Sequence, residues 1–227
     1  THQLILSFLV IIFVSLAATG TPATWFVDVS VAESGGGTTW ETAFKKIQDG
    51  IDGAADGDSV TVAPGTYVEN INFGGRNIVL TSTDPLDPDI VAATIIDGDQ
   101  AGSVVTFSGT ESECCVVSGF TIRNGKNNYG GAIKVGRITL AAIRNNLIVA
   151  NAADQDGGGL AYCDGVIETN IVTENSGGGL FRCHGLIQHN LISLNSGGGL
   201  DDCDGLISNN TIAENCAGLG GGLLDCD

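Results

Sequence analysis

The 227-residue chain contains no methionine and only nine Lys and Arg residues, against 26 Asp and Glu, which gives a formal net charge of −17. Proteins that bind nucleic acid need basic side chains to neutralise phosphates, so this composition argues against a nucleic-acid partner. It also disfavours anionic membrane surfaces. It permits Ca²⁺, which takes carboxylate and carbonyl oxygens, although acidic residues also simply keep a secreted protein soluble.

Long apolar runs are equally scarce. One run covers residues 4–18, is interrupted only by Ser7 and Ser15, and leads into small residues. It is short for a membrane span, which needs about 20 apolar residues, and is typical of a secretory signal. We therefore expect residues 1–22 to be a signal peptide, and the mature protein to be secreted, extracellular or on the cell surface, without a membrane span. A retained N-terminal anchor is the alternative. Because neither a methionine nor a basic start precedes the run, we expect the signal to lack its beginning.

Glycine, in contrast, is abundant, with 34 residues, and much of it is periodic. Three units of 20 residues align without gaps at 157–176, 177–196 and 197–216, and a fourth begins at residue 220. Their common pattern is G-G-G-L-x-x-C-[DH]-G-[VL]-I-x-x-N-x-[VI]-x-x-N. A fixed period of this length indicates an array of stacked units.

The composition of a unit indicates the kind of array. Apolar runs are two to four residues long, β-branched residues are frequent, and Gly or Asn recurs every four or five residues, so no helix fits. Three short strands per unit fit 20 residues, and each unit then pairs with the next at about 4.8 Å. The sequence therefore predicts a right-handed parallel β-helix over residues 60–227, regular from residue 157 and C-terminally incomplete. A leucine-rich repeat would need L-x-x-L-x-L, which is absent here.

Stacking places equivalent residues in columns. We expect inward Asn side chains to bond the turn backbone and the next coil, which satisfies polar groups that would otherwise be buried without partners. The first Asn column comprises Asn170, Asn190 and Asn210, and the second comprises Asn151, Asn175, Asn195 and Asn215. A third column comprises Cys163, Cys183, Cys203 and Cys226. Stacked buried thiols are the expectation for it, and disulfides between neighbouring coils are the alternative.

The earlier coils are less regular. We align residues 119–124 with residues 170–175, and residues 130–133 with the start of the repeat. Further strands are expected near residues 60–62, 78–81, 94–96, 104–107 and 115–117, with a loop at residues 83–89. Between residues 38 and 54, a Thr38–Glu41 capping-box spacing and apolar residues at helical intervals predict a short helix. We expect it to cover the N-terminal end of the β-helix, within an N-terminal strand-and-helix region at residues 23–59.

Residues 26–30 and 35–71 carry a family resemblance. Several motifs resemble the N-terminal region of secreted right-handed β-helix proteins. They are Thr39-Trp40, Gly57-Asp58, and Pro64-Gly65-Thr66-Tyr67 followed by Glu69. These include the pectate-lyase-like superfamily and bacterial surface β-helix proteins. The resemblance implies the fold. It leaves the activity open, because the group contains lyases, hydrolases, epimerases and adhesins.

Positions 5, 6 and 8 of each unit vary and include charges, so we expect them to face outward. Their aspartates would crowd together and favour a counter-ion, which makes a Ca²⁺ site a hypothesis. Its ligands would be Asp201, Asp202, Asp204, Asp225 and Asp227. Pectate lyases of the superfamily hold Ca²⁺ with acidic residues and use an Arg as base, and polygalacturonases use several Asp with a Gly-His-Gly. The resemblance therefore makes Arg182, His184, Asp202 and Asp204 the catalytic candidates. The alternative is that these residues form an ordinary column of solvent-exposed turn residues, with neither a bound ion nor a catalytic role.

No complete catalytic motif of the superfamily is reproduced in order. The first hypothesis is therefore a secreted or cell-surface module without catalysis, which is adhesive, structural or in contact with an extracellular polysaccharide or cell-surface glycan. The second is a Ca²⁺-assisted polysaccharide lyase or a glycoside hydrolase that acts on acidic polysaccharide.

Overall fold

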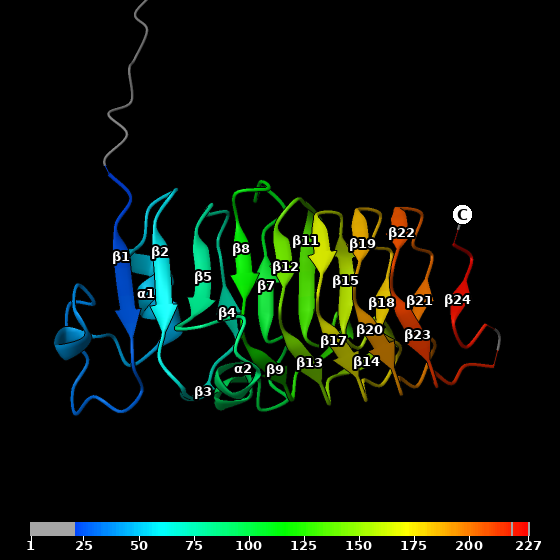
Figure 1. Ribbon diagram of the computed structural model, residues 1–227, viewed down its shortest axis with the longest axis horizontal. Helices are drawn as coiled ribbons and strands as arrows, with labels where there is room; N and C mark the ends of the chain where they lie inside the picture. The colour runs from blue at the N-terminus through cyan, green and yellow to red at the C-terminus, as the bar shows by residue number, and fades with distance from the viewer. Residues whose placement is uncertain (1–20, 219, 227) are drawn as a thin grey trace, which may run out of the picture.

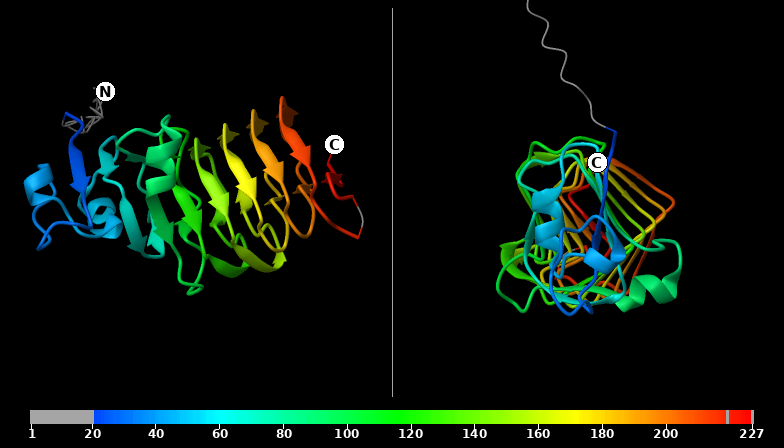
Figure 2. Two further views of the ribbon diagram at one scale, coloured as in Figure 1. Left: turned by 60° about the horizontal axis from the view of Figure 1, so that its bottom comes forward. Right: turned by 90° about the vertical axis from the view of Figure 1, so that its left-hand side faces the viewer.

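Successive coils of the chain stack into a parallel β-solenoid. The computed structural model describes residues 21–218 and 220–226, and in it the strands line up along one long axis with the chain running from one end to the other (Figure 1). Three sheets run the length of the stack, and every strand pair in them is parallel. Seen end-on, the coils enclose a common interior (Figure 2).

Each sheet receives one strand per coil. Sheet A contains β1 (Thr24–Val27), β2 (Ser59–Val62), β5 (Val79–Ser82), β8 (Val116–Ser118), β12 (Ala142–Arg144), β16 (Val166–Glu168), β19 (Leu186–Gln188) and β22 (Leu206–Ser208). Sheet B contains β3 (Gly65–Val68), β6 (Thr94–Asp97), β9 (Thr121–Arg123), β13 (Leu147–Val149), β17 (Ile171–Thr173), β20 (Leu191–Ser193) and β23 (Thr211–Ala213). Sheet C contains β4 (Ile71–Asn72), β7 (Val105–Phe107), β11 (Ile133–Thr139), β15 (Leu160–Cys163), β18 (Leu180–Phe181), β21 (Leu200–Asp201) and β24 (Leu223–Leu224).

The expected strands before the regular repeat are confirmed as β2, β5, β6, β7 and β8. The expected start of an earlier coil is also confirmed, because Ile133 pairs with Leu160. An additional two-stranded ladder joins β10 (Lys126–Tyr129) to β14 (Ala152–Asp156) at one corner. It continues as single bridges from Ala152 through Ser176 and Ser196.

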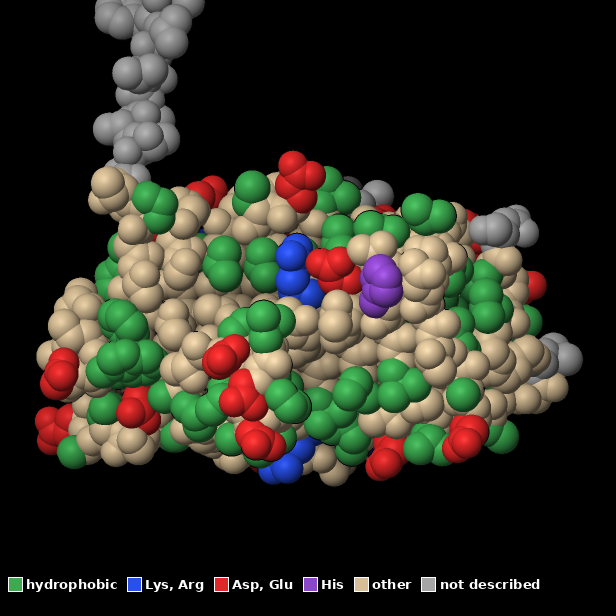
Figure 3. All heavy atoms as spheres, viewed as in Figure 1, with side chains coloured by type: hydrophobic (Ala, Val, Ile, Leu, Met, Phe, Trp, Pro, Cys, Tyr) green, Lys and Arg blue, Asp and Glu red, His purple; other side chains and the backbone are tan. Residues whose placement is uncertain are grey.

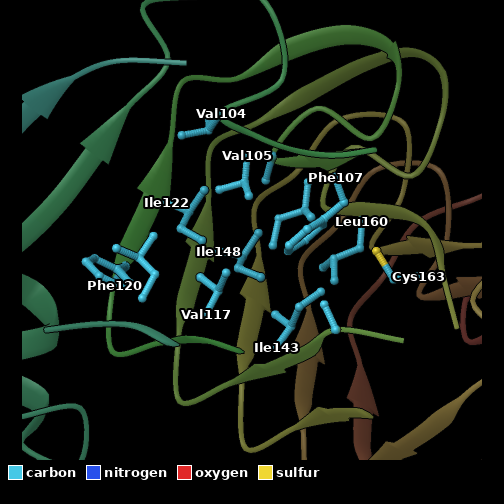
Figure 4. Packing of buried hydrophobic residues seen from close by; sticks show 14 of the residues in the cluster. Val104, Val105, Phe107, Val117, Phe120, Ile122, Ile143, Ile148, Leu160 and Cys163 are labelled. Carbon is cyan, nitrogen blue, oxygen red and sulfur yellow. The ribbon is translucent and has the colours of Figure 1, made fainter. Parts of the chain in front are cut away.

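The interior is apolar along its whole length. Alternate residues of each strand point inward and stack on their partners in the next coil, as Ile143, Ile167 and Ile187 do in sheet A. All three are fully buried. Figure 4 shows side chains of sheets A, B and C converging on this core, with Phe107 and Phe120 among the largest.

The Asn columns form the predicted ladders at the turns. The Asn170 backbone N–H donates to Asn190 Oδ1 at 2.9 Å, and Asn190 N–H donates to Asn210 Oδ1 at 2.9 Å. Each side-chain amide also donates to a carbonyl of the preceding coil, as Asn190 Nδ2 does to Ile167 at 2.8 Å. The second ladder has the same pattern from Asn151 through Asn175 and Asn195 to Asn215.

The first ladder also includes Asn146, which the sequence analysis missed. Its backbone N–H donates to Asn170 Oδ1 at 3.0 Å. Asn146 lies five residues before Asn151, the same spacing as between Asn170 and Asn175, so this signal was available in the sequence.

The predicted Cys column is confirmed. Cys163, Cys183 and Cys203 are fully buried, Cys226 is half-buried at the last coil, and all four are free thiols. The Cys183 backbone N–H lies 3.4 Å from Cys203 Sγ. Burial raises the pKa of the Cys183 thiol well above its usual value, as expected for a thiolate removed from water.

The alignment of residues 119–124 with residues 170–175 was wrong by one position. Thr121 pairs with Leu147, and Leu147 pairs with Ile171, so Phe120 and Gly125 occupy the two ladder positions. Their backbone N–H groups donate to Asn146 Oδ1 and Asn151 Oδ1. The ladders therefore begin one coil later than the sequence alignment implied.

The short helix expected between residues 38 and 54 is confirmed only over the second half of this segment. A 3₁₀ turn at Trp40–Thr42 is followed by extended chain and then by α1 (Ile47–Gly53). The capping box joins Thr39 to Thr42 instead of Thr38 to Glu41.

Glu69 caps α1 from outside the helix. No side chain at the Lys46 N-cap bonds the helix start. Instead, the Glu69 carboxylate accepts the N–H groups of Ile47 and Gln48 at 2.8 and 3.1 Å. Ile47 and Ile51 then join the core at the N-terminal end of the stack.

The expected loop at residues 83–89 continues into a second helix, α2 (Pro88–Ala93), which the sequence analysis missed. Asp87 caps it by accepting the Asp89 N–H at 2.9 Å, and proline occupies its first turn. Asp-Pro is a recognised helix-start signal. The helix lies outside the coils (Figure 2).

Candidate functional site

A groove opens on the outer surface of sheet C where β11 bulges. Five positions separate Lys134 from Thr139, whereas two separate their partners Ala161 and Cys163 on β15. Beside this bulge, Lys134, Val135 and Gly136 form one wall of a cavity of about 690 Å³. The lining residues are Lys134, Val135, Gly136, Tyr162, Asp164, Arg182 and His184.

The opposite wall consists of residues at positions 6 and 8 of the repeat. Position 6 has positive φ in every regular coil, with 64° at Tyr162, 50° at Arg182 and 51° at Asp202. This left-handed conformation turns the chain sharply at the end of each sheet C strand. Tyr162 and Asp202 are half-buried and Arg182 is exposed, so the expectation that position 6 faces outward agrees with the structure.

Arg182 forms a close ion pair with the next coil. Its Nε lies 2.5 Å from Asp202 Oδ2, and its guanidinium carbon lies 5.0 Å from the centroid of the Phe181 ring. The hydrogen bond to Asp202, followed by the charge of that carboxylate, raises the pKa of Arg182. The guanidinium is therefore held protonated, since an adjacent anion favours its charged form.

His184 lies between two coils in the same way. Its backbone N–H donates to Asp164 Oδ1 at 2.9 Å. The backbone N–H of Asp204 approaches His184 Nδ1 at 3.2 Å, and the Asp204 carboxylate lies 3.8 Å from that nitrogen. The four catalytic candidates are thus brought together as two coil-to-coil pairs, Arg182 with Asp202 and His184 with Asp204.

Three aromatic rings lie beside the groove, and the sequence analysis did not identify them as a group. Tyr129 from β10 stacks on Phe181 at 5.6 Å between ring centroids, and Tyr162 meets both rings edge-on. The Tyr129 hydroxyl bonds Gln155. Phe181 is buried in this cluster, and Ala161, at the same position of the preceding repeat, is also buried. The expectation that position 5 faces outward is therefore wrong for these two coils. Tyr129 belongs to an irregular coil, and no repeat register related it to Phe181.

The aspartates proposed as Ca²⁺ ligands are partly drawn together. Burial raises the pKa of Asp201, and the nearby charges of Asp156, Asp202 and Asp225 raise it further. Within residues 21–218 and 220–226, however, no group of three or more His, Cys, Asp or Glu side chains is arranged to hold a metal ion. Asp227 lies outside the described residues.

Comparison with known proteins found no relative. No protein-family model matches the chain, and neither a curated protein nor a solved structure matches it. Among the helices of the described residues, none has the length and apolar character needed to cross a membrane.

Proposed function

We propose that this chain is a secreted or cell-surface right-handed parallel β-helix that binds an extracellular or cell-surface glycan through the sheet C groove without catalysis. The observation that carries the proposal is a groove of about 690 Å³ that combines Tyr162 with Arg182, His184 and Asp164. Right-handedness is supported by the strong preference for right-handed connections between parallel strands of one sheet. The resemblance of residues 26–71 supports placement with the pectate-lyase-like and bacterial surface proteins, and the apolar run at residues 4–18 supports secretion.

The groove offers the two kinds of contact that a saccharide requires. A sugar ring has an apolar C–H face and a rim of hydroxyls that donate and accept hydrogen bonds. The tyrosine ring supplies a flat apolar surface with a polar tip, while guanidinium donors and a carboxylate acceptor suit hydroxyls. A concave surface with few convergent polar groups is typical of ligand sites.

Binding without catalysis is favoured because the candidate base is occupied. The guanidinium of Arg182 is protonated, as arginine is at ordinary pH, and its Nε lies 2.5 Å from Asp202 Oδ2, whereas a general base must be unprotonated to accept a proton. Asp202 is likewise engaged with Arg182.

A binding test uses the purified protein against a panel of neutral and acidic polysaccharides, with affinity measured by calorimetry. Tyr162→Ala should weaken binding at least about tenfold, equivalent to about 1.4 kcal/mol. His189→Ala is the matched control, because His189 also has positive φ (56°) and is exposed, but lies in a different column. Equal affinity of the two variants would show that the groove is not the glycan-binding site.

The second candidate is a Ca²⁺-assisted polysaccharide lyase or a glycoside hydrolase that acts on acidic polysaccharide. It is favoured by one observation, the proximity of Asp201 to the charges of Asp156, Asp202 and Asp225, because such clusters attract cations. Incubation with acidic polysaccharides and Ca²⁺ should then yield unsaturated or shortened products. Product formation that is lost in Asp202→Ala would establish this candidate in place of the first.

A further inference from the structure

A second cavity lies on a different face of the molecule, between α2 and the outer surface of sheet B. Its volume is about 310 Å³. One wall comes from the segment that includes Leu86 and Val91, and the other comes from Leu147 and Ile171 on two successive coils. The proposed glycan groove shares no residue with it.

The α2 wall is held firmly against the coils. Val91 carbonyl accepts the Thr121 hydroxyl at 2.9 Å, and Ile90 carbonyl accepts the Thr94 hydroxyl at 2.8 Å. At Gly119, a β-carbon would lie 2.6 Å from Pro85, so the loop before α2 packs directly on the chain between β8 and β9. Hydrogen bonds and close packing therefore fix the shape of the cavity.

Apolar side chains are exposed in and beside this cavity. Leu86 is 78% exposed, Ile171 is 44% exposed, and Leu191, its register partner in the next coil, is 38% exposed. Leu147, Ile171 and Leu191 occupy one column at the spacing of the strands, and thus form a continuous apolar stripe about 10 Å long. Contiguous exposed apolar surface beside a cavity is typical of a binding surface.

The α2 side of the cavity rim is acidic. Asp84, Asp87 and Asp89 lie within six residues on the α2 segment, and none of them forms an ion pair with the part of the chain that the structure describes. No Lys or Arg occurs between Arg76 and Arg123 in the sequence. Figure 3 shows acidic side chains over α2 beside a hydrophobic area that extends toward the C-terminal coils.

We propose that this surface docks a cationic peptide segment of another protein, with one large apolar side chain in the cavity and flanking Lys or Arg residues against the acidic rim. The cavity volume suits an anchor side chain and little else, at the lower limit for small-molecule sites of roughly 300–1,000 Å³. Because the rim is negatively charged, the peptide residues that flank the anchor should be positively charged. The same charge attracts a cationic partner toward the site.

The test measures fluorescence anisotropy of a labelled synthetic peptide in which Leu and Phe are flanked by four lysines. The wild-type protein should bind this peptide more tightly than versions with glutamates in place of lysines or glycines in place of Leu and Phe. Raising NaCl from 0.05 to about 0.5 M should weaken binding, because exposed charges are screened.

Matched variants locate the site. Leu86→Ser and Ile171→Ser should each weaken binding at least about tenfold. Val68→Ser on β3 should not, although Val68 is 63% exposed, a fraction between those of Leu86 and Ile171. The pair Asp84→Asn with Asp89→Asn should weaken binding about three- to tenfold at low salt, and Asp154→Asn, exposed on β14, should leave it unchanged.

Four results would overturn the proposal. One is equal binding of the lysine and glutamate peptides, and another is equal loss in Leu86→Ser and Val68→Ser. A third is binding of an alkylammonium ion as tight as that of the peptide, which would identify a small-amphiphile site. The last is self-association in sedimentation that Leu86→Ser abolishes, which would identify a second copy of this chain as the occupant.

Discussion

The Asn ladders show how single residues hold neighbouring coils in register. Asn190 Oδ1 accepts both the backbone N–H and the side-chain amide of Asn170, while its own amide reaches the Ile167 carbonyl. Each ladder residue follows one with positive φ, such as Thr169 at 57° and His189 at 56°. The amide therefore bonds the backbone where a tight turn interrupts the sheet ladder.

Replacing Asn190 with Ala should lower the free energy of unfolding by about 2–4 kcal/mol, because the Asn170 N–H and the Ile167 carbonyl would lose buried partners. Urea unfolding followed by circular dichroism measures this. His189→Ala, at the neighbouring exposed residue, is the control and should change stability by less than about 1 kcal/mol. Similar losses in both variants would contradict a structural role for the ladder.

The Cys residues should divide by exposure in their reactivity. Burial raises the pKa of Cys115 to about 12 and raises that of Cys183 well above its usual value, whereas Cys114 and Cys216 are exposed. Because the thiolate is the reactive species, iodoacetamide should alkylate Cys114 and Cys216 in the native protein and the buried column only after unfolding. Peptide mass spectrometry identifies the sites. Column thiols that resist alkylation in denaturant until a reductant is added would instead reveal disulfides between coils.

At the scale of elements, one carboxylate reinforces the pairing of the N-terminal strand β1 with β2. Asp58 accepts the Ala23 and Ala55 N–H groups at 2.7 and 3.0 Å and the Trp25 indole N–H at 3.0 Å. The Ala23 and Ala55 bonds, followed by the Trp25 bond, lower the pKa of Asp58. Its charged form is therefore the one that the folded state favours.

The lowered pKa gives a definite pH dependence. The stabilisation is present above the ordinary carboxyl pKa of about 3.9 and is lost as the pH falls through the lowered value. Acid titration should therefore loosen the Ala23–Trp25 end of β1, and the fluorescence of Trp25, which stacks on Phe44, should change with it. Asp58→Asn should flatten this part of the titration, while Asp49→Asn, at an exposed residue of α1, should retain it. An unchanged titration in Asp58→Asn would contradict this assignment.

The elements that the sequence analysis placed wrongly were decided by pairing with distant segments. Phe44 lies at a helical interval from Ile47 and Ile51, but its carbonyl accepts the Asp28 N–H at 2.8 Å and it bridges to Val27. This contact with β1 keeps the chain extended, so α1 begins only at Ile47. Periodicity alone could not distinguish the two outcomes, because both bury the same apolar residues.

At the scale of the whole molecule, a solenoid contacts only its neighbours from coil to coil, so stability depends on position along the stack. Ile148 and Ile212 occupy the same column of sheet B through Val172 and Ile192. Ile148 is fully buried in the middle of the stack, whereas Ile212 is half-buried in the last described coils. The same side chain therefore has different packing at the two positions.

Ile148→Ala should lower the free energy of unfolding by about 2–5 kcal/mol, and Ile212→Ala should lower it by less than half as much. Urea unfolding of both variants under identical conditions tests this difference. Equal losses would show that the stack unfolds as one unit in which the last coil is packed as tightly as the centre.

The sequence by itself determined the period, and within the regular coils it determined the strand positions and the inward columns. In a stack of coils of equal length, residues one repeat apart are paired, so the repeat length fixes the register. It also identified Arg182, His184, Asp202 and Asp204, which the structure brings together in pairs across coils. Only the tertiary structure decided how the irregular coils meet the regular ones. The β11 bulge, the approach of Tyr129 to Phe181, and the packing of α2 over Leu147 and Ile171 join segments of unequal length. No periodicity relates such segments, so their contacts arise from packing in three dimensions.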